Sequence, residues 1–506
     1  VRLMESKGMP LHLPGAATTI LNWLESLPTT VLNARPELWW KQASLLLTLG
    51  QTAGVEGKLQ ATEAVLAAAA LPDAELDDQT RNLIGEIAVA RASLALAQHQ
   101  AETIHVQARR ALEYLHPNNL PYRSEALQAI GYAYYLQGDR AAAGRAYAEA
   151  LALAQASGNM INTLLATTCL GQIQQLENQL YLAAATYQRV LQLIRDYSPS
   201  NAGVVTFGLA RICYEWNDLE SAEQLGEQTL QLARQYSQFV NRFIMCGVFL
   251  ARLKLVRGDL SGAAALLVQA EQSVREHGFL HRMPEVVAVQ VLMVLRRGNL
   301  AAAADLAQRY ELPMCRARVL LAQGNPSAAL AMLGPYRQQV EARNWQDERL
   351  RAMVLQAVAL HAHGEKDKAV HLLGETLALA EPGGFIRIFV DEGQPMALLL
   401  AEVAACGTMP DYTAKLLAAC AADEPRPADD AVRPASFAAQ PLIEPLSERE
   451  LEVLRLIAQG LSNHEIGERL FLALDTVKGH NRHIFDKLQV QRRTEAIARA
   501  RELGLL

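Results

Sequence analysis

Aromatic residues and cysteines are scarce in this chain, and neither forms a pattern typical of a functional site. Phe, Trp and Tyr make up 6% of the 506 residues, a composition that favours packed helices over sheets. The six cysteines include no CxxC pair and no His partner at metal-ligand spacing. We therefore interpret them as buried thiols in a reducing cytoplasm, not as disulfides or metal ligands.

Long apolar runs and an excess of positive charge are also missing. No stretch of about 18 apolar residues is free of charge, and the N-terminus shows no basic region followed by a hydrophobic core. The sequence therefore predicts a cytoplasmic protein without a membrane partner. The net charge is −6, and residues 1–444 carry the negative excess, so we do not expect that part to bind nucleic acid.

The motifs of common enzymes and nucleotide-binding proteins are absent as well. The chain has no GxSxG, no HExxH, and no cluster of His and carboxylates at metal spacing. Its only Gly-Lys pair, Gly57-Lys58, is followed by Leu59 and lacks the Gly five residues earlier that a phosphate-binding loop requires. We predict no enzymatic activity, no metal and no cofactor for these residues.

The chain does contain an internal repeat of about 40 residues, in which an apolar helix, a short turn and an alanine-rich helix recur. One helix pair cannot bury its apolar face alone and must stack on the next, so this period predicts an α-solenoid. One shorter spacing predicts an abbreviated pair near residues 312–323. The turns are expected at Gly138-Asp139, Asn178-Gln179, Asn217-Asp218, Gly258-Asp259, Gly298-Asn299, Gly324-Asn325 and Gly364-Glu365.

Residues 126–159 resemble a tetratricopeptide repeat, in which small residues let two helices approach and a Tyr fills the space between them. We expect about eight such units between residues 45 and 380. The positions that carry the resemblance are Gly131, Tyr132, Gly138, Ala142, Tyr147 and Ala150.

Half of the aromatic residues lie between Tyr122 and Phe249. The groove of a solenoid is a typical binding site for peptides, partner proteins or small effectors. Some of these aromatics could line a pocket for a sugar or another stackable ligand, or they could be core residues between the repeat helices. The candidate effector contacts are Tyr134, Tyr135, Tyr181, Tyr214 and Trp216. Nearby arginines that could meet an anionic effector, or simply be solvated, are Arg123, Arg140, Arg145 and Arg211.

The last part of the chain, residues 446–506, predicts four short helices. Two Ser-x-x-Glu sequences, Ser447 to Glu450 and Ser462 to Glu465, have the spacing of capping boxes and mark the starts of the first and second helix. A brief turn then leads into the third helix. Two short helices joined by a tight turn are typical of a helix-turn-helix.

The third helix, residues 474–488, has the features of a helix that enters the major groove of DNA. A period of 3.6 residues turns Lys478, Gly479 and Arg482 outward. Gly479 has no side chain to hold the backbone away from DNA, and Arg482 could bind a guanine through two nitrogens. Thr476 and Lys478 lie near the helix N-terminus, where backbone amides favour phosphate.

The distribution of charge agrees with this orientation. Residues 476–506 carry seven basic and three acidic side chains, whereas residues 445–475 carry three and six. The basic half therefore contains the helix expected to face DNA. An ordinary small helical bundle with a solvated run of charge is the alternative interpretation.

The segments SERELEVLRLIAQGLSNHEIGERL, TVKGH and KLQV…RRTEAIARARELGLL closely resemble the LuxR-type helix-turn-helix of bacterial transcription regulators. The resemblance implies that the third helix reads the major groove and that a fourth helix, near residues 494–503, helps the protein to dimerise. Two positions depart from the family pattern: Ala473 stands where Ser is frequent, and Gly467 where Ala is usual. The resemblance places DNA contacts on Thr476, Lys478, Gly479 and Arg482, with Asn463 as a phosphate ligand.

Upstream, the stretch GFIRIFVDEGQPM resembles the segment that closes the sensor arm in the MalT-like branch of LuxR regulators. We expect a short extended piece at residues 386–390 and a helix from Pro395. Members of that branch usually carry an N-terminal ATPase. With Val1 as the first residue, we expect this chain to be a truncated form of a longer regulator and ATP to belong to the missing part.

Together these observations predict an all-α protein, a tetratricopeptide-like α-solenoid superhelix followed by a four-helix LuxR-type helix-turn-helix domain. The expected parts are a helical cap (1–44), the repeats (45–380), a closing segment with helices (381–422), a proline-rich linker (423–445) and the DNA-binding domain (446–506).

As function we expect a transcription regulator, in the main interpretation an activator, whose arm responds to an effector or partner protein. It would act as a homodimer on double-stranded DNA, with RNA polymerase as a further partner. The alternative is a repeat-protein scaffold or effector receptor whose C-terminal domain mainly dimerises.

Overall fold

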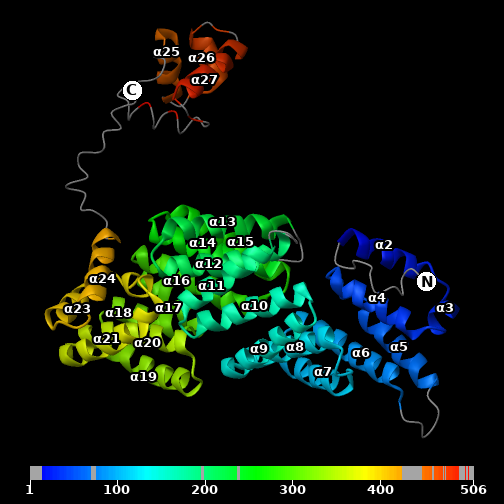
Figure 1. The fold of residues 1–506 in the computed structure, drawn as a ribbon. Helices are drawn as coiled ribbons and strands as arrows, with labels where there is room; N and C mark the ends of the chain where they lie inside the picture. Colours follow the sequence, from blue (N-terminus) through cyan, green and yellow to red (C-terminus); the bar gives the residue numbers. More distant parts are fainter. Residues whose placement is uncertain are drawn as a thin grey trace. The chain divides into compact units, whose positions relative to one another are not determined.

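The computed structural model describes residues 14–69, 76–194, 199–235, 240–423, 447–458, 461–470, 472, 474–488, 490, 496 and 500. Within these residues all regular structure is helical (Figure 1). The chain divides into two compact units, residues 1–423 and 424–506. The first unit is called the arm below, and the second the C-terminal unit.

The arm consists of antiparallel helices that pack on their neighbours in sequence. Its first half contains α2 (Pro14–Glu25), α3 (Thr29–Asn33), α4 (Pro36–Thr48), α5 (Val55–Ala69), α6 (Asp78–Ala97), α7 (Ala101–Tyr114), α8 (Leu120–Gln137), α9 (Arg140–Ala156), α10 (Met160–Leu176), α11 (Leu180–Ile194), α12 (Pro199–Glu215) and α13 (Leu219–Gln235).

The second half of the arm continues in the same way and includes the abbreviated pair that the sequence predicts. Its helices are α14 (Val240–Val256), α15 (Leu260–Glu276), η2 (Leu280–Arg282), α16 (Met283–Arg296), α17 (Leu300–Arg309), α18 (Pro313–Ala322), α19 (Pro326–Ala342), α20 (Gln346–Ala362), α21 (Lys366–Ala380), η3 (Glu381–Gly383), α22 (Arg387–Val390), α23 (Gln394–Ala405) and α24 (Pro410–Asp423). Both α17 and α18 have only 10 residues, against 17 in α19 and α20.

The predicted turns between paired helices are confirmed. In each, one residue adopts the left-handed conformation with φ between 62° and 90°, which glycine and asparagine tolerate best. The next residue often caps the following helix: Asp139 accepts a hydrogen bond from the Ala142 amide at 2.9 Å, and Asp259 from that of Gly262 at 2.7 Å. The left-handed residues are Gly138, Asn178, Asn217, Gly258, Gly298, Gly324 and Gly364.

Buried tyrosines fill the spaces between helices, as the resemblance to tetratricopeptide repeats implies. Tyr147 on α9 packs against Gly131 on α8, where a Cβ would lie 2.6 Å from the ring. Tyr187 on α11, which is fully buried, fits between Gly171 on α10 and Gly208 on α12. The glycines at these positions therefore set how closely the helices approach.

We predict that Gly208→Ala destabilises the arm by about 1–3 kcal/mol, the usual cost of overpacking a core. The new Cβ would lie 2.5 Å from Cε2 of Tyr187, and the ring cannot retreat because Gly171 holds its opposite edge. Urea unfolding followed by circular dichroism measures the loss. Gly247→Ala in the middle of α14 is the matched control, because its Cβ would meet only Ala270 at 3.9 Å. The control should be as stable as the native protein or slightly more so. Equal stability of both variants would contradict the packing argument.

The C-terminal helices of the arm fold back onto its first half (Figure 1). Helix α20 packs against α10, and α22 against α12, within one hydrophobic core that contains Tyr187, Ile212, Met353 and Phe389 among others. The predicted turns take part in this contact. The Trp345 indole donates to the Gly138 carbonyl at 2.8 Å, and the Asn178 amide nitrogen to that of Gln346 at 3.0 Å. The turns at Gly138 and Asn178 are thus covered by the chain's own helices.

The closing segment, residues 381–392, contains two short helical turns and no strand, and the extended piece predicted at residues 386–390 is wrong. It forms η3 and the single turn α22, and every residue from Phe385 to Val390 is buried. Alternation of Ile and Val in so short a run indicates a strand only when one face is solvated. Here all faces are covered, so alternation carried no information. The Ile386 amide instead donates to the Glu215 carbonyl at 2.7 Å.

The C-terminal unit contains α25 (Glu448–Ala458), α26 (Asn463–Leu470) and α27 (Leu474–Leu488). They enclose a small core with Val453, Ile466, Val477 and Ile484 fully buried. Of the predicted fourth helix only Ala496 and Ala500 lie within the described residues, and both are helical and part of that core. Most of the predicted linker lies outside the described residues. None of the described helices is both long and apolar enough to cross a bilayer.

Candidate functional site

Helix α27 presents the face that the sequence assigns to DNA. Thr476, Lys478 and Arg482 are exposed, and Gly479 lies between them with nothing within 4 Å of the position its Cβ would occupy. On the opposite face Val477 and Ile484 are buried, together with Asn481. The structure therefore brings four of the five predicted DNA contacts onto one open face. Their roles stay a prediction.

An ion pair ties α27 to α25. The Lys487 Nζ lies 3.0 Å from Oε2 of Glu450, and both side chains are largely buried. Glu450 also closes the predicted capping box by accepting from the Ser447 amide at 2.8 Å. Burial would raise the pKa of Glu450, but these two hydrogen bonds outweigh it and hold the pKa below its ordinary value. The α27 helix is thus fixed by a carboxylate that stays ionised at neutral pH.

The fifth predicted contact, Asn463, lies at the start of α26. Its side-chain oxygen accepts a hydrogen bond from the side-chain amide nitrogen of Asn481 at 2.8 Å, and this bond joins α26 to α27. The second capping box also forms, since the Ser462 amide donates to Glu465 at 2.7 Å. Asn463 therefore has a structural partner, and the phosphate contact predicted for it stays a prediction.

The two departures from the family pattern have different outcomes. At Gly467 a Cβ would lie 2.8 Å from the carbonyl oxygen of Leu472, so the turn after α26 passes too close for an unadjusted alanine. Glycine at this position allows that close approach. Ala473 lies outside the described residues.

The predicted effector aromatics fall into two separate groups. In the first, Tyr134 and the exposed Tyr135 lie on α8. The Tyr134 hydroxyl accepts from Arg109 at 3.3 Å, and the Tyr135 ring stacks on Tyr132 at 6.0 Å. Tyr134 also lines an open pocket of about 360 Å3, whose other lining residues are Arg109, Arg145, Glu149 and apolar residues of α7, α8 and α9.

The second group lies against the closing segment. Tyr181 stacks on Trp216 with ring centroids 4.9 Å apart, and the Trp216 indole donates to the Gly383 carbonyl at 2.9 Å. Tyr214 is buried and donates to Oδ2 of Asp391 at 2.7 Å. These contacts favour the alternative that Tyr214 and Trp216 are core residues, whereas Tyr181 is 56% exposed.

Sequence reasoning missed the polar cluster around Arg387. This side chain is fully buried, binds Oδ1 of Asp391 at 2.6 Å and Oδ1 of Asp423 at 2.7 Å, and contacts Asn217. Arg252 also pairs with Asp391, at 2.7 Å. Burial opposes the charge on Asp391, but the two guanidinium groups hold the pKa of its carboxyl below the ordinary value. A lone Arg inside the apolar run FIRIFV was the one available signal.

The four arginines singled out near the aromatics have different surroundings. Arg140 forms an ion pair with Asp347, and Arg123 donates to the carbonyl of Leu112 at 3.1 Å. Arg145 is exposed. Among the residues described, no group of three or more His, Cys, Asp or Glu side chains could hold a metal ion.

Two family matches cover most of the chain. Residues 85–405 match the family described as MalT-like TPR region, where TPR stands for tetratricopeptide repeat. Residues 444–500 match the family described as bacterial regulatory proteins, luxR family. The two matches correspond to the arm and to the C-terminal unit.

Among curated proteins the chain is similar to the HTH-type transcriptional regulator MalT of Yersinia pestis (strain Pestoides F), with 24% identity over 510 residues. The alignment covers 95% of this chain and 55% of that protein. MalT of Yersinia enterocolitica aligns with the same identity and coverage. The chain thus spans about half the length of the curated relatives it matches.

Among solved structures the arm is similar in fold to a Rap protein complexed with Competence and Sporulation Factor. The TM-score is 0.55 at 13% identity, with 69% of this chain and 99% of the Rap chain covered. This likeness concerns the helical repeats alone. Because the first family match covers more than half of this chain, the chain belongs to the MalT-like TPR family, and its C-terminal part belongs to the luxR family of bacterial regulatory proteins.

Proposed function

We propose that this chain is the sensing and DNA-binding part of a transcription regulator, and that α27 docks in the major groove. The observation that carries this proposal is the exposed face of Thr476, Lys478, Gly479 and Arg482 on a helix whose other face is buried. Guanidinium and ammonium groups on one open face can contact base edges and phosphates together. An activator role is the form of regulation we expect.

The arm, in this proposal, binds an effector or partner protein and controls the DNA-binding unit. It consists of tetratricopeptide-like repeats, an architecture that offers extended binding surfaces. The similar Rap structure is a complex with Competence and Sporulation Factor, which supports a sensing role for such a fold. We further propose a cytoplasmic homodimer, with RNA polymerase as a partner, no catalytic activity, and no cofactor within these residues.

Selection of bound sites from a random duplex pool tests the proposal. The whole chain and residues 440–506 alone would be assayed at low and moderate salt, because phosphate contacts make binding salt-dependent. We expect both to enrich one motif, and the difference in affinity would report how the arm controls the domain. Enrichment of nothing by either, with a chain that still dimerises, would support the interaction scaffold instead.

Two substitutions on α27 separate base from phosphate contacts. Arg482→Ala should weaken binding to the selected motif by about 1–3 kcal/mol and relax the base preference at one position. Lys478→Ala should weaken binding to all sequences alike and reduce the salt slope by about 1. Fluorescence anisotropy over a salt series measures both. Arg455→Ala is the matched control, since Arg455 is exposed on α25 and should leave binding unchanged. An unaltered base preference in Arg482→Ala would contradict the proposed orientation of α27.

A further inference from the structure

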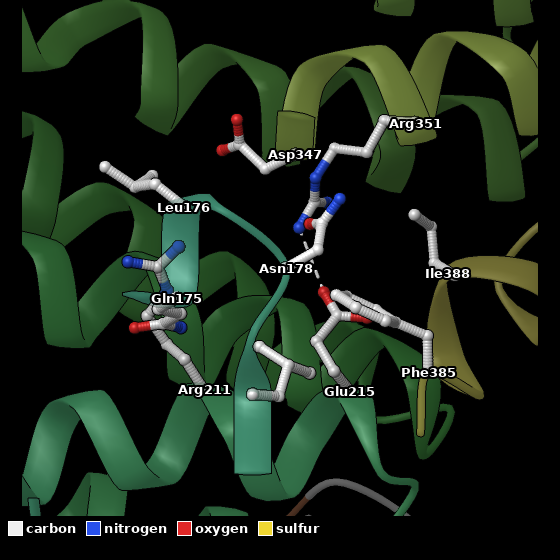
Figure 2. Close-up of a pocket in the computed structure, with 10 residues that line it drawn as sticks. Gln175, Leu176, Asn178, Arg211, Glu215, Asp347, Arg351, Phe385 and Ile388 are labelled. Carbon is white, nitrogen blue, oxygen red and sulfur yellow. Dashed lines mark hydrogen bonds and ion pairs between the residues drawn. The ribbon is translucent and has the colours of Figure 1, made fainter. Parts of the chain in front are cut away.

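A small pocket lies where α10 and α12 meet α20 and the closing segment (Figure 2). Its apolar wall includes Phe385 and Ile388, and charged side chains from α12 and α20 complete it. Its cavity volume is about 30 Å3, against about 360 Å3 for the open pocket beside Tyr134. The pocket therefore suits a molecule with few heavy atoms.

Two of the residues that line this pocket each have a buried acceptor atom with no hydrogen-bond donor within the described part of the chain. The atoms are Oδ1 of Asn178 and Oε2 of Glu215. Glu215 is only 7% exposed, and its other carboxylate oxygen accepts from Arg351 at 2.9 Å. A buried acceptor without a donor costs about 1–3 kcal/mol. An occupant with N–H donors would remove that cost.

The same pocket contains an arginine whose donors are unused. Arg211 has no hydrogen-bond or ion-pair partner among the residues described, although its side chain is half-buried. Figure 2 shows Arg211 on one side of the turn at Asn178, with Glu215 and Arg351 on the other. A guanidinium in such a position is suited to a carboxylate, which can accept two parallel hydrogen bonds.

Two arginines and two carboxylates line the pocket, so it favours neither a cation nor an anion. A lone cation would be repelled by Arg211 and Arg351, and a lone anion by Glu215 and Asp347. A molecule with both charges, separated by a short spacer, meets an opposite charge at each end. Its ammonium end supplies the donors that the two buried acceptors lack.

We propose that this pocket binds a free α-amino acid with a small side chain, its ammonium donating to Glu215 and Asn178 and its carboxylate accepting from Arg211. The inference deepens the proposed function, since it rests on the arm being a sensor. The pocket also joins both halves of the arm. Asn178, Arg211 and Glu215 belong to the first half, and Phe385 and Ile388 to the closing segment. Occupancy therefore stabilises the folded-back position of the closing segment.

The test is a binding measurement on the whole chain, using glycine, L-alanine and L-serine as probes. Each should raise the melting temperature saturably at concentrations up to about 10 mM, because a ligand that binds only the folded state stabilises it. Acetate and methylammonium, which carry one end each, should bind at least about tenfold more weakly. Isothermal titration calorimetry on the strongest probe gives the dissociation constant.

Arg211→Gln should weaken amino-acid binding at least about tenfold while leaving the melting temperature of the free protein nearly unchanged, because the substitution removes no hydrogen bond or ion pair within the described part of the chain. Arg189→Gln, at an exposed position on α11, is the matched control and should bind as the native chain does. Three results would overturn the inference: no saturable shift with any amino acid, so that the pocket holds water only; equal shifts with acetate or methylammonium; or unchanged binding by Arg211→Gln.

The DNA experiment is independent of this one. A chain that selects a DNA motif but binds no amino acid removes this inference and leaves the proposed function intact. A chain that binds an amino acid through Arg211 but selects no DNA motif contradicts the proposed DNA-binding function and leaves the amino-acid site intact.

Discussion

Replacing Arg387 with leucine should lower the free energy of unfolding of the arm by about 3–5 kcal/mol, the usual cost of removing one partner from a buried ion pair. The guanidinium is fully buried and binds Asp391 and Asp423. Asp391 keeps Arg252 and Tyr214 as partners. Asp423 loses the one guanidinium that the structure places against it, and the buried space left by the guanidinium is polar.

The loss should appear first at the end of the arm. Asp423 is the last residue of α24, so the bond from Arg387 fixes the point from which the chain continues towards the C-terminal unit. We expect faster hydrogen exchange in residues 387–391 and in the last turn of α24, beside a lower urea midpoint. In this way the closing segment, which also lines the amino-acid pocket, determines how firmly the end of the arm is held.

A matched control for this substitution is Arg309→Leu. Arg309 pairs with Asp305 one turn away on α17, with both side chains more than 60% exposed. Exposed pairs of this kind contribute less than about 1 kcal/mol, so the urea midpoint should hardly change. A loss in Arg387→Leu no larger than in this control would show that the buried cluster does not hold the closing segment.

The second large effect concerns Glu125 and should depend on pH. This carboxyl lies on α8, largely buried, where burial raises its pKa to about 7; the nearby Glu86 adds to the rise and a hydrogen bond from Asn162 at 3.3 Å opposes it. Burial also raises the pKa of Glu86. The folded-state pKa lies above the ordinary value of 4.5, so the folded state favours the protonated carboxyl. The contribution of protonated Glu125 to the free energy of unfolding is therefore complete below about pH 4.5 and is lost as the pH rises through 7.

Glu125→Gln keeps the size of the side chain and an oxygen that can accept from Asn162, but it cannot ionise. The variant should equal the native protein near pH 4.5 and exceed it at pH 8 by up to about 3 kcal/mol. Urea unfolding at both pH values measures the difference. Glu149→Gln, at an exposed position on α9, should follow the native protein throughout. A Glu125→Gln variant that is less stable than the native chain at pH 8 would show that the carboxylate is stabilised there.

Most of the repeat architecture could be predicted from the sequence because it depends on local rules. A left-handed turn residue is usually Gly or Asn, and a following Asp or Asn often caps the next helix, so Gly138-Asp139 and its counterparts were recognisable without coordinates. The same holds for the capping boxes at Ser447 and Ser462 and for the outward face of α27, which follows from a period of 3.6 residues.

The closing segment could not be predicted in this way. Its residues from Phe385 to Val390 are all buried. Alternation of side chains indicates a strand only when one face is exposed to solvent, so the pattern here did not distinguish a strand from a helical turn. Its helical turn is fixed by contacts with distant parts of the chain, among them the bond from the Ile386 amide to the Glu215 carbonyl.

What the sequence determined by itself is therefore the helical repeats, their turns, and the basic reading face of a LuxR-type domain, because neighbouring residues specify each of these. Only the tertiary structure decided that the end of the arm folds back across the turns at Gly138 and Asn178. It also placed Arg211 and Glu215 around one pocket with residues of the closing segment. The residues concerned lie up to about 200 positions apart, and no local pattern records a contact over that separation.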